Sequence, residues 1–374
     1  MPKSILAQTI TPCPWIVETA GGVLDQQGGT FAGDRSEMAI TSRDVARLAG
    51  VSQPTVSRAL RGDPRVAAET RARVESAVAA LGYVPSEAGR NLVTRTAKRI
   101  GIVVSDLTNP FYPHLIGPLH DALEDHGYRM MVFTEPSDSQ VSVGQLVDGS
   151  VDGVVLLTSD VGSALPAELS RRRVPFVFLN RESGPGVGDA AVVDNDLGGR
   201  LAAKHFTGLG HRRIAGIFGP QTTSTGRDRE MGFRLALADA GIGLSPELTH
   251  RGSFEFDTGH RAMRELLALP SPPTAVFCGN DVVAIGALNA ASAAGVRVPD
   301  VLSLIGFDDI PMASWEVFQL TTIGHDLNLM ARSAAELLVE RIKGSSTEPP
   351  RRIMSRPHVV ERSTTAPPSP RQPS

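Results

Sequence analysis

Beyond residue 99, short apolar runs alternate with longer stretches in which apolar residues recur every three or four positions. The runs predict buried strands and the periodic stretches predict amphipathic helices, because these spacings match the side-chain repeats of the two elements. Strands are expected at 100–104, 130–133, 153–157, 176–179, 214–218, 275–277 and 302–307. Helices are expected at 113–126, 195–209, 226–240, 257–269, 281–294 and 326–343.

This regular alternation is typical of an α/β fold with doubly wound parallel sheets. It continues from residue 99 to residue 363, which is longer than the stretch that one hydrophobic core usually serves. The sequence therefore predicts two lobes, each built around its own parallel sheet.

A separate all-helical segment precedes this region, with three short helical patterns between residues 41 and 81. Ser42 is expected to cap the first helix, and Gly50 to make the tight turn after it. Ser52 is expected to cap a second helix that runs to about Leu60, with Pro54 in the first turn, where the missing N–H costs nothing. The third helix carries an apolar stripe made of Val74, Ala77, Val78 and Leu81.

The stretch TSRDVARLAGVSQPTVSRALRGDPRV has the pattern of a helix-turn-helix. In this motif a first helix packs across a second, which exposes small and polar side chains to the DNA major groove. The expected small core consists of Val45, Leu48, Val51, Val56 and Leu60. The side chains expected to face outward are Gln53, Pro54, Thr55, Ser57 and Arg58. Arginine suits guanine and glutamine suits adenine; a generic three-helix bundle is the alternative.

The net charge of the helical segment also differs from that of the rest of the chain. Residues 42–99 hold eleven basic and five acidic residues, a net charge of +6, whereas the remainder is acidic at −9. A basic module beside an acidic body favours a segment that attracts phosphates.

Several other classes of protein are disfavoured. Nothing approaches the run of about 18 apolar residues that a membrane span needs, and the opening MPKSILAQTITPCPW is a poor signal peptide. Cys13 and Cys278 are far apart and neither has a partner at metal-ligand spacing, so a reducing cytoplasm is expected, with no metal and no cofactor. No nucleotide-binding glycine motif or nucleophile elbow occurs, so we do not expect an enzyme. His211 is expected to be structural.

The segment DVARLAGVSQPTVSRAL closely resembles the headpiece of the LacI/GalR family of bacterial transcription regulators. The resemblance continues in family order through LGYVPSEAGRNL, SDLTNPFYPHL, VDGVVLL, VDNDLGGRLAAKHFTGLGHRRIA, RDREMGFRLAL, FCGNDVVAIGAL and VLSLIGFDDI. It covers roughly residues 40–363, and the combined motifs are highly specific. It implies a helix-turn-helix headpiece and a hinge helix, followed by a periplasmic-binding-protein-like effector domain of two lobes.

The resemblance also implies a homodimer that binds a pseudo-palindromic DNA operator, usually as a repressor under allosteric control by a small molecule. Gln53, Pro54 and Arg58 match base-reading positions, while Thr55 and Ser57 would favour phosphates. Leu92 matches a leucine that wedges into the minor groove, although it could be a simple core leucine. The expected DNA-binding residues are Ser52, Gln53, Pro54, Thr55, Ser57, Arg58, Arg90 and Leu92.

Two departures from the family pattern affect the DNA-binding part. Gly89 stands in the hinge helix where alanine is common, which lowers helix propensity by about 1 kcal/mol. Ala67 replaces the usual Ser-type cap before the third helix, which removes about 1 kcal/mol.

Polar and aromatic residues at strand ends and in loops of the α/β region are expected to bind the effector, because open α/β folds gather ligands there. They are Asn109, Phe111, Tyr112, Asn180, Arg181, Thr225, Arg229, Phe254, Asn280, Asp281, Asp308, Trp315 and His325. Sugars are typically held by Asp, Asn and Arg side chains with an aromatic ring beneath the apolar face, so a sugar or related metabolite is expected. Asn180 and Asp281 could equally be caps or surface residues, and His325 replaces a glutamine common in the family.

The expected organisation is a disordered extension (1–37), a headpiece (38–84), a hinge and linker (85–98), an effector-binding and dimerisation domain (99–363) and a disordered tail (364–374). A transport-type sugar-binding protein of the same two-lobed fold is the alternative function, and the basic headpiece and poor signal peptide count against it.

Overall fold

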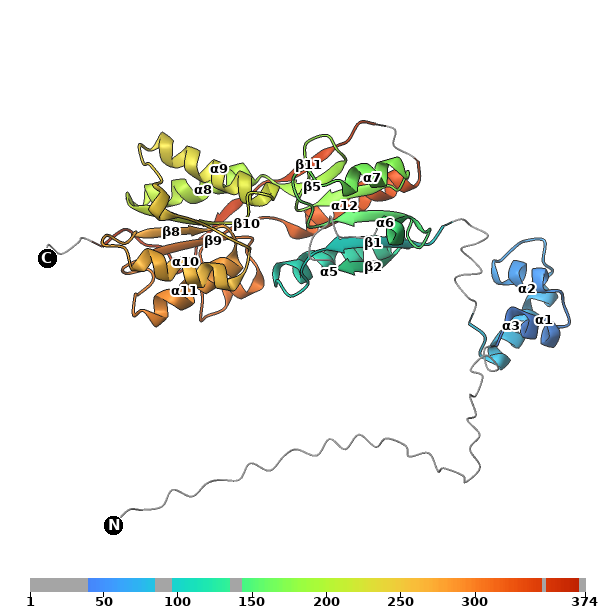
Figure 1. Cartoon of the computed structure of the whole chain (residues 1–374). Coiled ribbons are helices and arrows are strands. Elements are labelled where there is room, and N and C mark those ends of the chain that lie inside the picture. Colours follow the sequence, from blue (N-terminus) through green and yellow to red (C-terminus); the bar gives the residue numbers. More distant parts are fainter. Residues whose placement is uncertain (1–39, 85–95, 135–142, 345–347, 370–374) are drawn as a thin grey trace, which may run out of the picture. The chain divides into compact units, whose positions relative to one another are not determined.

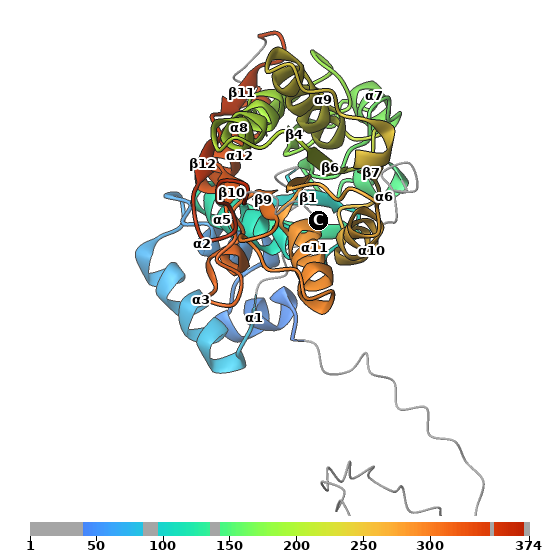
Figure 2. The same ribbon diagram turned by 90° about the vertical axis from the view of Figure 1, so that its left-hand side faces the viewer.

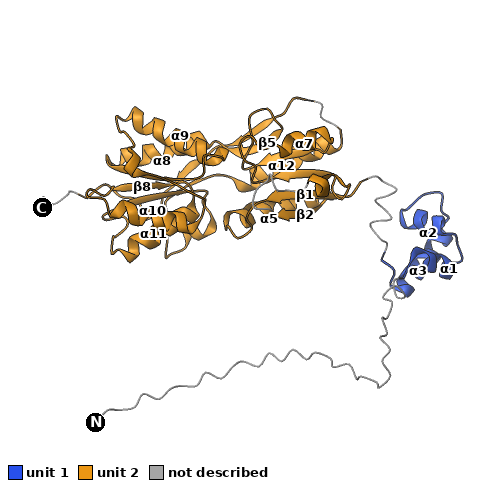
Figure 3. Cartoon of the chain, in the orientation of Figure 1, with its two compact units in different colours: residues 1–87 blue, residues 88–374 orange. Residues whose placement is uncertain are grey.

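The computed structural model describes residues 40–84, 96–134, 143–344 and 348–369. The chain forms two compact units, residues 1–87 and 88–374 (Figure 3). Several sequence predictions lie outside the described residues: the extension 1–37, the hinge helix at 85–95 with Gly89, Arg90 and Leu92, and residues 370–374 of the tail.

The first unit is a three-helix domain made of α1 (Ser42–Ala49), α2 (Gln53–Leu60) and α3 (Ala68–Leu81). Thr41, not Ser42, occupies the N-cap of α1 and forms a capping box with Asp44, so the expected cap was one residue too late. Ser52 is the N-cap residue of α2, and Ala67 is the N-cap of α3 without a side-chain hydrogen bond, both as expected.

The core of this unit differs from the expected one at two positions. It contains Val45, Ala46, Ala49, Val56, Ala59, Val74 and Ala77. Leu48 is 56% exposed and Leu60 is 37% exposed, so the prediction that both are core residues was wrong. Each lies one position, about 100° of helix rotation, from an inward-facing alanine, Ala49 or Ala59. These small alanines let the helices approach closely, and α3 then fills the inner face.

The second unit contains two lobes, each with a six-stranded sheet (Figure 1). The N-lobe sheet has the order β11-β5-β4-β3-β1-β2 and is parallel throughout. Its strands are β1 (Arg99–Val104), β2 (Arg129–Thr134), β3 (Gly153–Leu156), β4 (Phe176–Leu179), β5 (Asp189–Val193) and β11 (Arg352–Ser355). Its helices are α5 (Phe111–Asp125), α6 (Val143–Val147), α7 (Leu165–Arg171) and α12 (Leu327–Ile342).

The C-lobe sheet has the order β12-β10-β9-β8-β6-β7, with β12 antiparallel at the edge. Its strands are β6 (Ile214–Phe218), β7 (Thr249–Arg251), β8 (Ala275–Cys278), β9 (Ser303–Phe307), β10 (Thr322–Gly324) and β12 (His358–Val360). Its α-helices are α8 (Asn195–Gly208), α9 (Ser224–Asp239), α10 (Phe256–Leu267) and α11 (Asp281–Ala293). Short 3₁₀ turns occur at η2 (Pro246–Leu248) and η3 (Pro311–Ser314). Helices α8 and α9 cover one face of this sheet and α10 and α11 the other (Figure 2).

The chain crosses between the lobes three times, from β5 to α8, from β10 to α12 and from β11 to β12. In each lobe the first strand lies between the next two strands along the chain, which is the doubly wound arrangement expected from the sequence. This arrangement brings the carboxyl ends of the strands in each lobe to one edge, where ligands bind in folds of this kind.

All seven expected strands are present, but the sequence pattern missed β5, β7, β10, β11 and β12 and the helices α6 and α7. The missed strands have three to five residues each. Each also contains polar or charged residues that shorten its apolar pattern, and pairing with a neighbouring strand decides its conformation.

The prediction of a disordered tail from residue 364 was wrong for residues 364–369. Thr364 is 3% exposed, and its Oγ1 donates to the Leu304 carbonyl at 2.7 Å. The Ala366 N–H donates to Ser303 Oγ at 3.0 Å. His211 lies 2.9 Å from the Ala366 carbonyl and 2.9 Å from Thr274 Oγ1, so it is structural, as expected. Residues 364–369 are held by backbone and side-chain groups of residues far away in the chain, which local composition cannot indicate.

Candidate functional site

The outer face of α2 presents most of the residues expected to contact DNA. Ser52, Gln53, Pro54, Ser57 and Arg58 are exposed, whereas Thr55 is half-buried. Ser52 Oγ and Thr55 Oγ1 share a hydrogen bond of 2.8 Å, so the side chain of the cap residue bonds to a neighbouring hydroxyl. Gln53 Nε2 donates to Ser42 Oγ on α1 at 2.9 Å. This face offers a guanidinium, an amide and hydroxyls, which are groups suited to base edges and phosphates.

In the second unit, a polar cavity lies where the carboxyl ends of strands from both lobes meet. It is lined by Asn109, Phe111, Tyr112, Asn180, Arg181, Thr225, Arg229, Phe254, Asn280 and Asp308. The structure thus brings together ten of the thirteen residues that the sequence assigned to effector binding. The cavity has an empty volume of about 260 Å³, and about 20 Å³ of it admits the centre of a water molecule.

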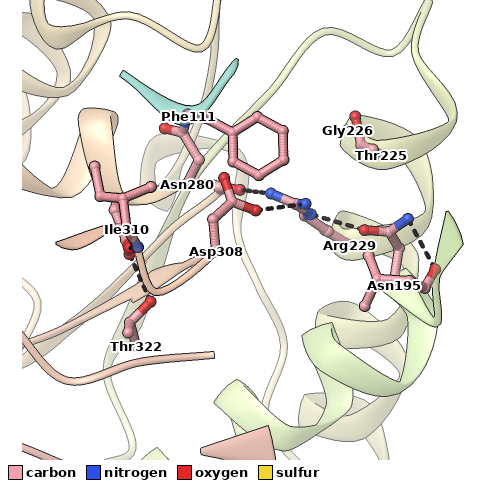
Figure 4. Close-up of polar contacts among 12 residues, drawn as sticks. Phe111, Asn195, Thr225, Gly226, Arg229, Asn280, Asp308, Ile310 and Thr322 are labelled. Carbon is pink, nitrogen blue, oxygen red and sulfur yellow. Dashed lines mark hydrogen bonds and ion pairs between the residues drawn. The ribbon is translucent and has the colours of Figure 1, made fainter. Parts of the chain in front are cut away.

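Arg229 on α9 is held at the cavity by three hydrogen bonds, although its side chain is 3% exposed. Its Nε donates to Asn195 Oδ1 at 2.8 Å, Nη1 donates to the Gly279 carbonyl at 2.7 Å, and Nη2 donates to Asp308 Oδ1 at 2.9 Å (Figure 4). The guanidinium carbon lies 3.6 Å from the centre of the Phe307 ring. A guanidinium has five N–H groups, so two remain for a ligand.

Two residues that position Arg229 were missed by sequence reasoning. Asn195 is the first residue of α8, which follows the β5 strand after a single residue. It lies in the segment VDNDLGG, where no sequence pattern indicates that this side chain positions an arginine. Gly199 lies one turn later, and a Cβ atom there would collide with the backbone oxygen of Arg229. The close packing of α8 on α9 therefore requires this glycine, and the same packing fixes where Arg229 emerges.

Asp308 follows β9 and is 4% exposed. Its φ of 108° is unusual for a residue other than glycine, and its N–H donates to the Ile323 carbonyl at 2.8 Å, which helps to hold that conformation. Burial raises the pKa of Asp308 to about 6, while Arg229 opposes that shift. Burial lowers the pKa of Arg229 and Asp308 opposes that change; the guanidinium remains charged.

Two buried polar atoms at the cavity have no hydrogen-bond partner among the described residues, Asn180 Oδ1 and Arg181 Nε. Asn180 is 4% exposed and adopts a left-handed φ of 74° at the end of β4. A buried polar atom without a partner costs about 1–3 kcal/mol. Their position at the cavity makes polar groups of a ligand suitable partners.

Aromatic rings form the rest of the wall. Phe111 and Tyr112 pack edge to face at 5.5 Å, and burial raises the pKa of the Tyr112 hydroxyl. The ring of Phe254 lies 5.4 Å from the Arg181 guanidinium and 5.8 Å from that of Arg229. The cavity therefore combines hydrogen-bonding groups with flat apolar surfaces.

Hydrogen bonds join the two lobes around this cavity. Asn109 Nδ2 donates to the Phe254 carbonyl at 2.9 Å, and its Oδ1 accepts from the Phe111 N–H at 3.0 Å. The Val161 N–H donates to the Thr222 carbonyl at 2.8 Å. The Glu182 N–H donates to Ser224 Oγ at 3.1 Å. The lobes are therefore in a closed arrangement.

Three expected effector residues do not line the cavity. Asp281 is fully buried at the start of α11, where it accepts from the Ile310 N–H and from Thr322 Oγ1, at 2.9 and 2.5 Å. It supports the loop after β9, and burial raises its pKa well above the usual value. Asn280 beside it does line the cavity and also caps α11.

Trp315 ends the η3 turn and stacks on Phe318, and its side chain is 54% exposed, so its ring faces solvent and not the cavity. His325 is 8% exposed and packs beside Phe307, and neither of its ring nitrogens has a partner among the described residues. Burial and the nearby Arg229 lower the pKa of His325 to about 3, which keeps the ring neutral.

A second, more apolar cavity adjoins the first and has an empty volume of about 650 Å³. It is lined by Asp106, Thr108, Asn109, Pro110, Phe254, Glu255, Phe256, Val282, Ile285 and Met312. Asn109 and Phe254 line both cavities and separate them. Sequence reasoning missed this cavity because several segments, far apart in the chain, each contribute a few residues.

The described part of the chain shows no group of three or more His, Cys, Asp or Glu residues that could hold a metal ion. None of its helices is long and apolar enough to cross a membrane.

Comparison with known families gives two matches. Residues 41–86 match the model of bacterial regulatory proteins of the lacI family. Residues 203–365 match the model of the periplasmic binding protein-like domain. The first match covers the three-helix unit and the second covers most of the C-lobe.

Relatives of known function match over nearly their whole length. The HTH-type transcriptional regulator CelR of Thermobifida fusca is 37% identical over 85% of this chain and 96% of its own length. The HTH-type transcriptional repressor CytR of Escherichia coli K12 is 35% identical over 89% of this chain and 98% of its own.

Solved structures agree with these matches. A complex of the regulator CelR with cellobiose has a TM-score of 0.68 at 35% identity, covering 87% of this chain and 99% of that one. A lac repressor dimer bound to operator and the anti-inducer ONPF has a TM-score of 0.79 at 27% identity, with the same coverage.

Proposed function

This chain belongs to the LacI family of bacterial regulatory proteins, and from that membership we propose that it represses transcription as a homodimer on a pseudo-palindromic operator. A small molecule, a sugar or a related metabolite, controls the binding. We further propose that it acts in the cytoplasm, where bacterial DNA lies. Like these relatives, the protein is a DNA-binding transcription regulator and not an enzyme.

The proposed DNA interface is the exposed face of α2. Gln53, Pro54 and Arg58 read base edges in the major groove, while Ser52, Thr55 and Ser57 bond to phosphates that fix the helix in register. Two residues outside the described part, Arg90 and Leu92, complete the interface in the hinge, where Leu92 wedges into the minor groove. The proposed functional division remains headpiece 38–84, hinge 85–98 and effector domain 99–363.

The polar cavity between the lobes is the proposed effector site, and the Arg229–Asp308 pair is the single observation that carries this part. The pair offers two remaining N–H groups beside a carboxylate, and Asn180 Oδ1 and Arg181 Nε lie at the same cavity without partners. Neighbouring donors and acceptors of this kind fit the hydroxyls of a sugar, and the Phe111, Tyr112 and Phe254 rings fit its apolar face. The structure of the relative CelR with cellobiose supports a sugar.

Effector entry requires the lobes to open. The space that admits the centre of a water molecule is about 20 Å³, which is room for roughly one water molecule. Opening would break the interlobe hydrogen bonds of Asn109 and Glu182. An effector that binds one arrangement of the lobes more tightly shifts the population toward it. We propose that this shift determines whether the two hinge segments of the dimer can fold together on DNA.

A thermal shift screen of the full-length protein tests the effector site. The panel would contain hexoses, pentoses, disaccharides including cellobiose, and nucleosides. A true effector at 100 times its dissociation constant should stabilise the protein by about 2.7 kcal/mol. If no compound stabilises the protein, or if none changes its affinity for DNA, the proposed control by a sugar-like molecule is wrong.

Selection from random DNA followed by gel shift tests the operator. An inverted repeat is expected, with a CG step at its centre as the family resemblance suggests, because two symmetric headpieces occupy two half-sites. Recovery of a direct repeat, or of a lone half-site at full affinity, would contradict the proposed dimeric mode.

A further inference from the structure

The Gln53 side chain on the proposed DNA-binding face is hydrogen-bonded to a residue of the neighbouring helix. Its Nε2 atom donates a hydrogen bond of 2.9 Å to Ser42 Oγ, from the first residue of α2 to the first residue of α1. The two residues are eleven positions apart in the sequence and come together because α1 and α2 pack through Val45 and Val56, both fully buried.

Ser42 is available for this contact because it does not cap its own helix. Thr41 holds that role, and the Asp44 carboxylate accepts from the Thr41 backbone N–H at 3.0 Å and from its hydroxyl at 2.7 Å. The start of α1 is thus fixed independently of the Ser42 hydroxyl. At the start of α2, the hydroxyls of Ser52 and Thr55 are hydrogen-bonded to each other.

The contact changes what the Gln53 amide can offer to a base. A glutamine amide has two N–H donors and one oxygen acceptor. With one N–H given to Ser42, one donor and the Oε1 acceptor remain, a pair that matches N7 and the N6 amino group of adenine. Guanine presents two acceptors, N7 and O6, at the same edge, so the held amide would place its oxygen against an acceptor.

We propose that Ser42 is a positioning residue that orients the Gln53 amide and thereby makes Gln53 prefer adenine over guanine. Ser42 acts through Gln53, not through a base contact of its own. The inference rests on the proposed role of Gln53 in base reading.

A double-mutant cycle in the full-length protein tests this inference. Selection with the wild-type protein first gives the operator, and the base pair that Gln53 reads is the one whose preference relaxes in Gln53→Ala. The preference for adenine over guanine at that base pair is then measured by gel shift in Ser42→Ala, Gln53→Ala and the double variant. The same change in an exposed serine of α3, Ser76→Ala, is the control.

Ser42→Ala is expected to lower that preference by about two- to tenfold, the effect of one hydrogen bond, and Ser76→Ala to leave it unchanged. In the Gln53→Ala background, the loss of Ser42 should have no further effect, because its partner is absent. An equal effect of Ser42→Ala with and without Gln53 would mean that Ser42 contacts DNA directly and would overturn the inference. An unchanged preference in Ser42→Ala would also overturn it.

A matched pair of changes at Ser42 separates the effect of losing the hydroxyl from any effect on folding. Ser42→Thr keeps the hydroxyl, whereas Ser42→Val introduces a side chain of nearly the same shape as threonine without it. The Ser42→Thr variant should retain the preference and the Ser42→Val variant should lose it, although the two variants melt at similar temperatures. Equal behaviour of the two would refute the role of the hydroxyl. If the wild-type protein itself enriches no DNA sequence, the proposed function fails, and the inference falls with it.

Discussion

Arg229 and Asp308 form a buried ion pair at the cleft between the lobes, with Nη2 2.9 Å from Oδ1, although 79 positions separate them in the chain. Both side chains are at most 5% exposed. Charges this well buried require partners, and Arg229 has further bonds to Asn195 and Gly279. The pair therefore links the stability of the C-lobe to the proposed effector site.

Breaking the pair from one side should be costly. Arg229→Met is expected to lower the free energy of unfolding by about 3–5 kcal/mol, because it leaves the Asp308 carboxylate buried without its cation. The double variant Arg229→Met with Asp308→Asn should lose less than the sum of the two single changes, since no charge is then left unpaired and asparagine tolerates the positive φ of residue 308. Urea unfolding of the four proteins measures this, and additive losses would show that the pair is not coupled.

Asn180 offers a way to disturb the effector site without disturbing the fold. Its Oδ1 has no partner among the described residues, and glycine accepts its φ of 74° without strain. Asn180→Gly should therefore keep its melting temperature within a few degrees and its operator affinity within about threefold of the wild type. It should lose most of its response to the effector found in the screen. A variant that still responds fully would remove Asn180 from the proposed site.

His325 should make the protein less stable in mild acid. Its pKa is lowered to about 3 by burial, whereas in the unfolded chain it is about 6.5. Below pH 6.5 the unfolded state therefore binds a proton that the folded state does not, and stability present above that pH is lost as the pH falls.

Between pH 6 and pH 5 this residue should account for a loss of about 1 kcal/mol. His325→Gln, which removes the titrating group, should lose that much less over the same interval. Unfolding by urea at the two pH values measures the difference. An identical pH dependence in the variant and the wild type would show that His325 is protonated in the folded protein.

Arg58 is expected to read a base. Arg58→Ala should weaken binding to the selected operator by about 1–3 kcal/mol and relax sequence preference at one base pair. Arg73, exposed on α3 and outside the proposed interface, provides the control, and Arg73→Ala should leave the base preference unchanged. Gel shifts against single-base operator variants give both results. A full base preference in Arg58→Ala would show that α2 is not the recognition helix.

Local sequence patterns were enough to predict part of the fold. The spacing around Gly50 and Pro54 predicted the helix-turn-helix, and the alternating apolar runs predicted seven of the strands and the two doubly wound lobes. These features are visible locally because helices and strands impose their periods on neighbouring residues. The chain's motifs, read together, also indicated its family.

The packing of distant elements determines which polar side chains meet and what each one does there. Asp281, next to the cavity residue Asn280 in sequence, instead supports a loop, and Trp315 points outward. Asn109 bonds to Phe254 at a separation of 145 positions. Such contacts depend on the packing of distant elements: the same residue types are found in caps, loop supports and binding sites, so local sequence cannot tell these roles apart.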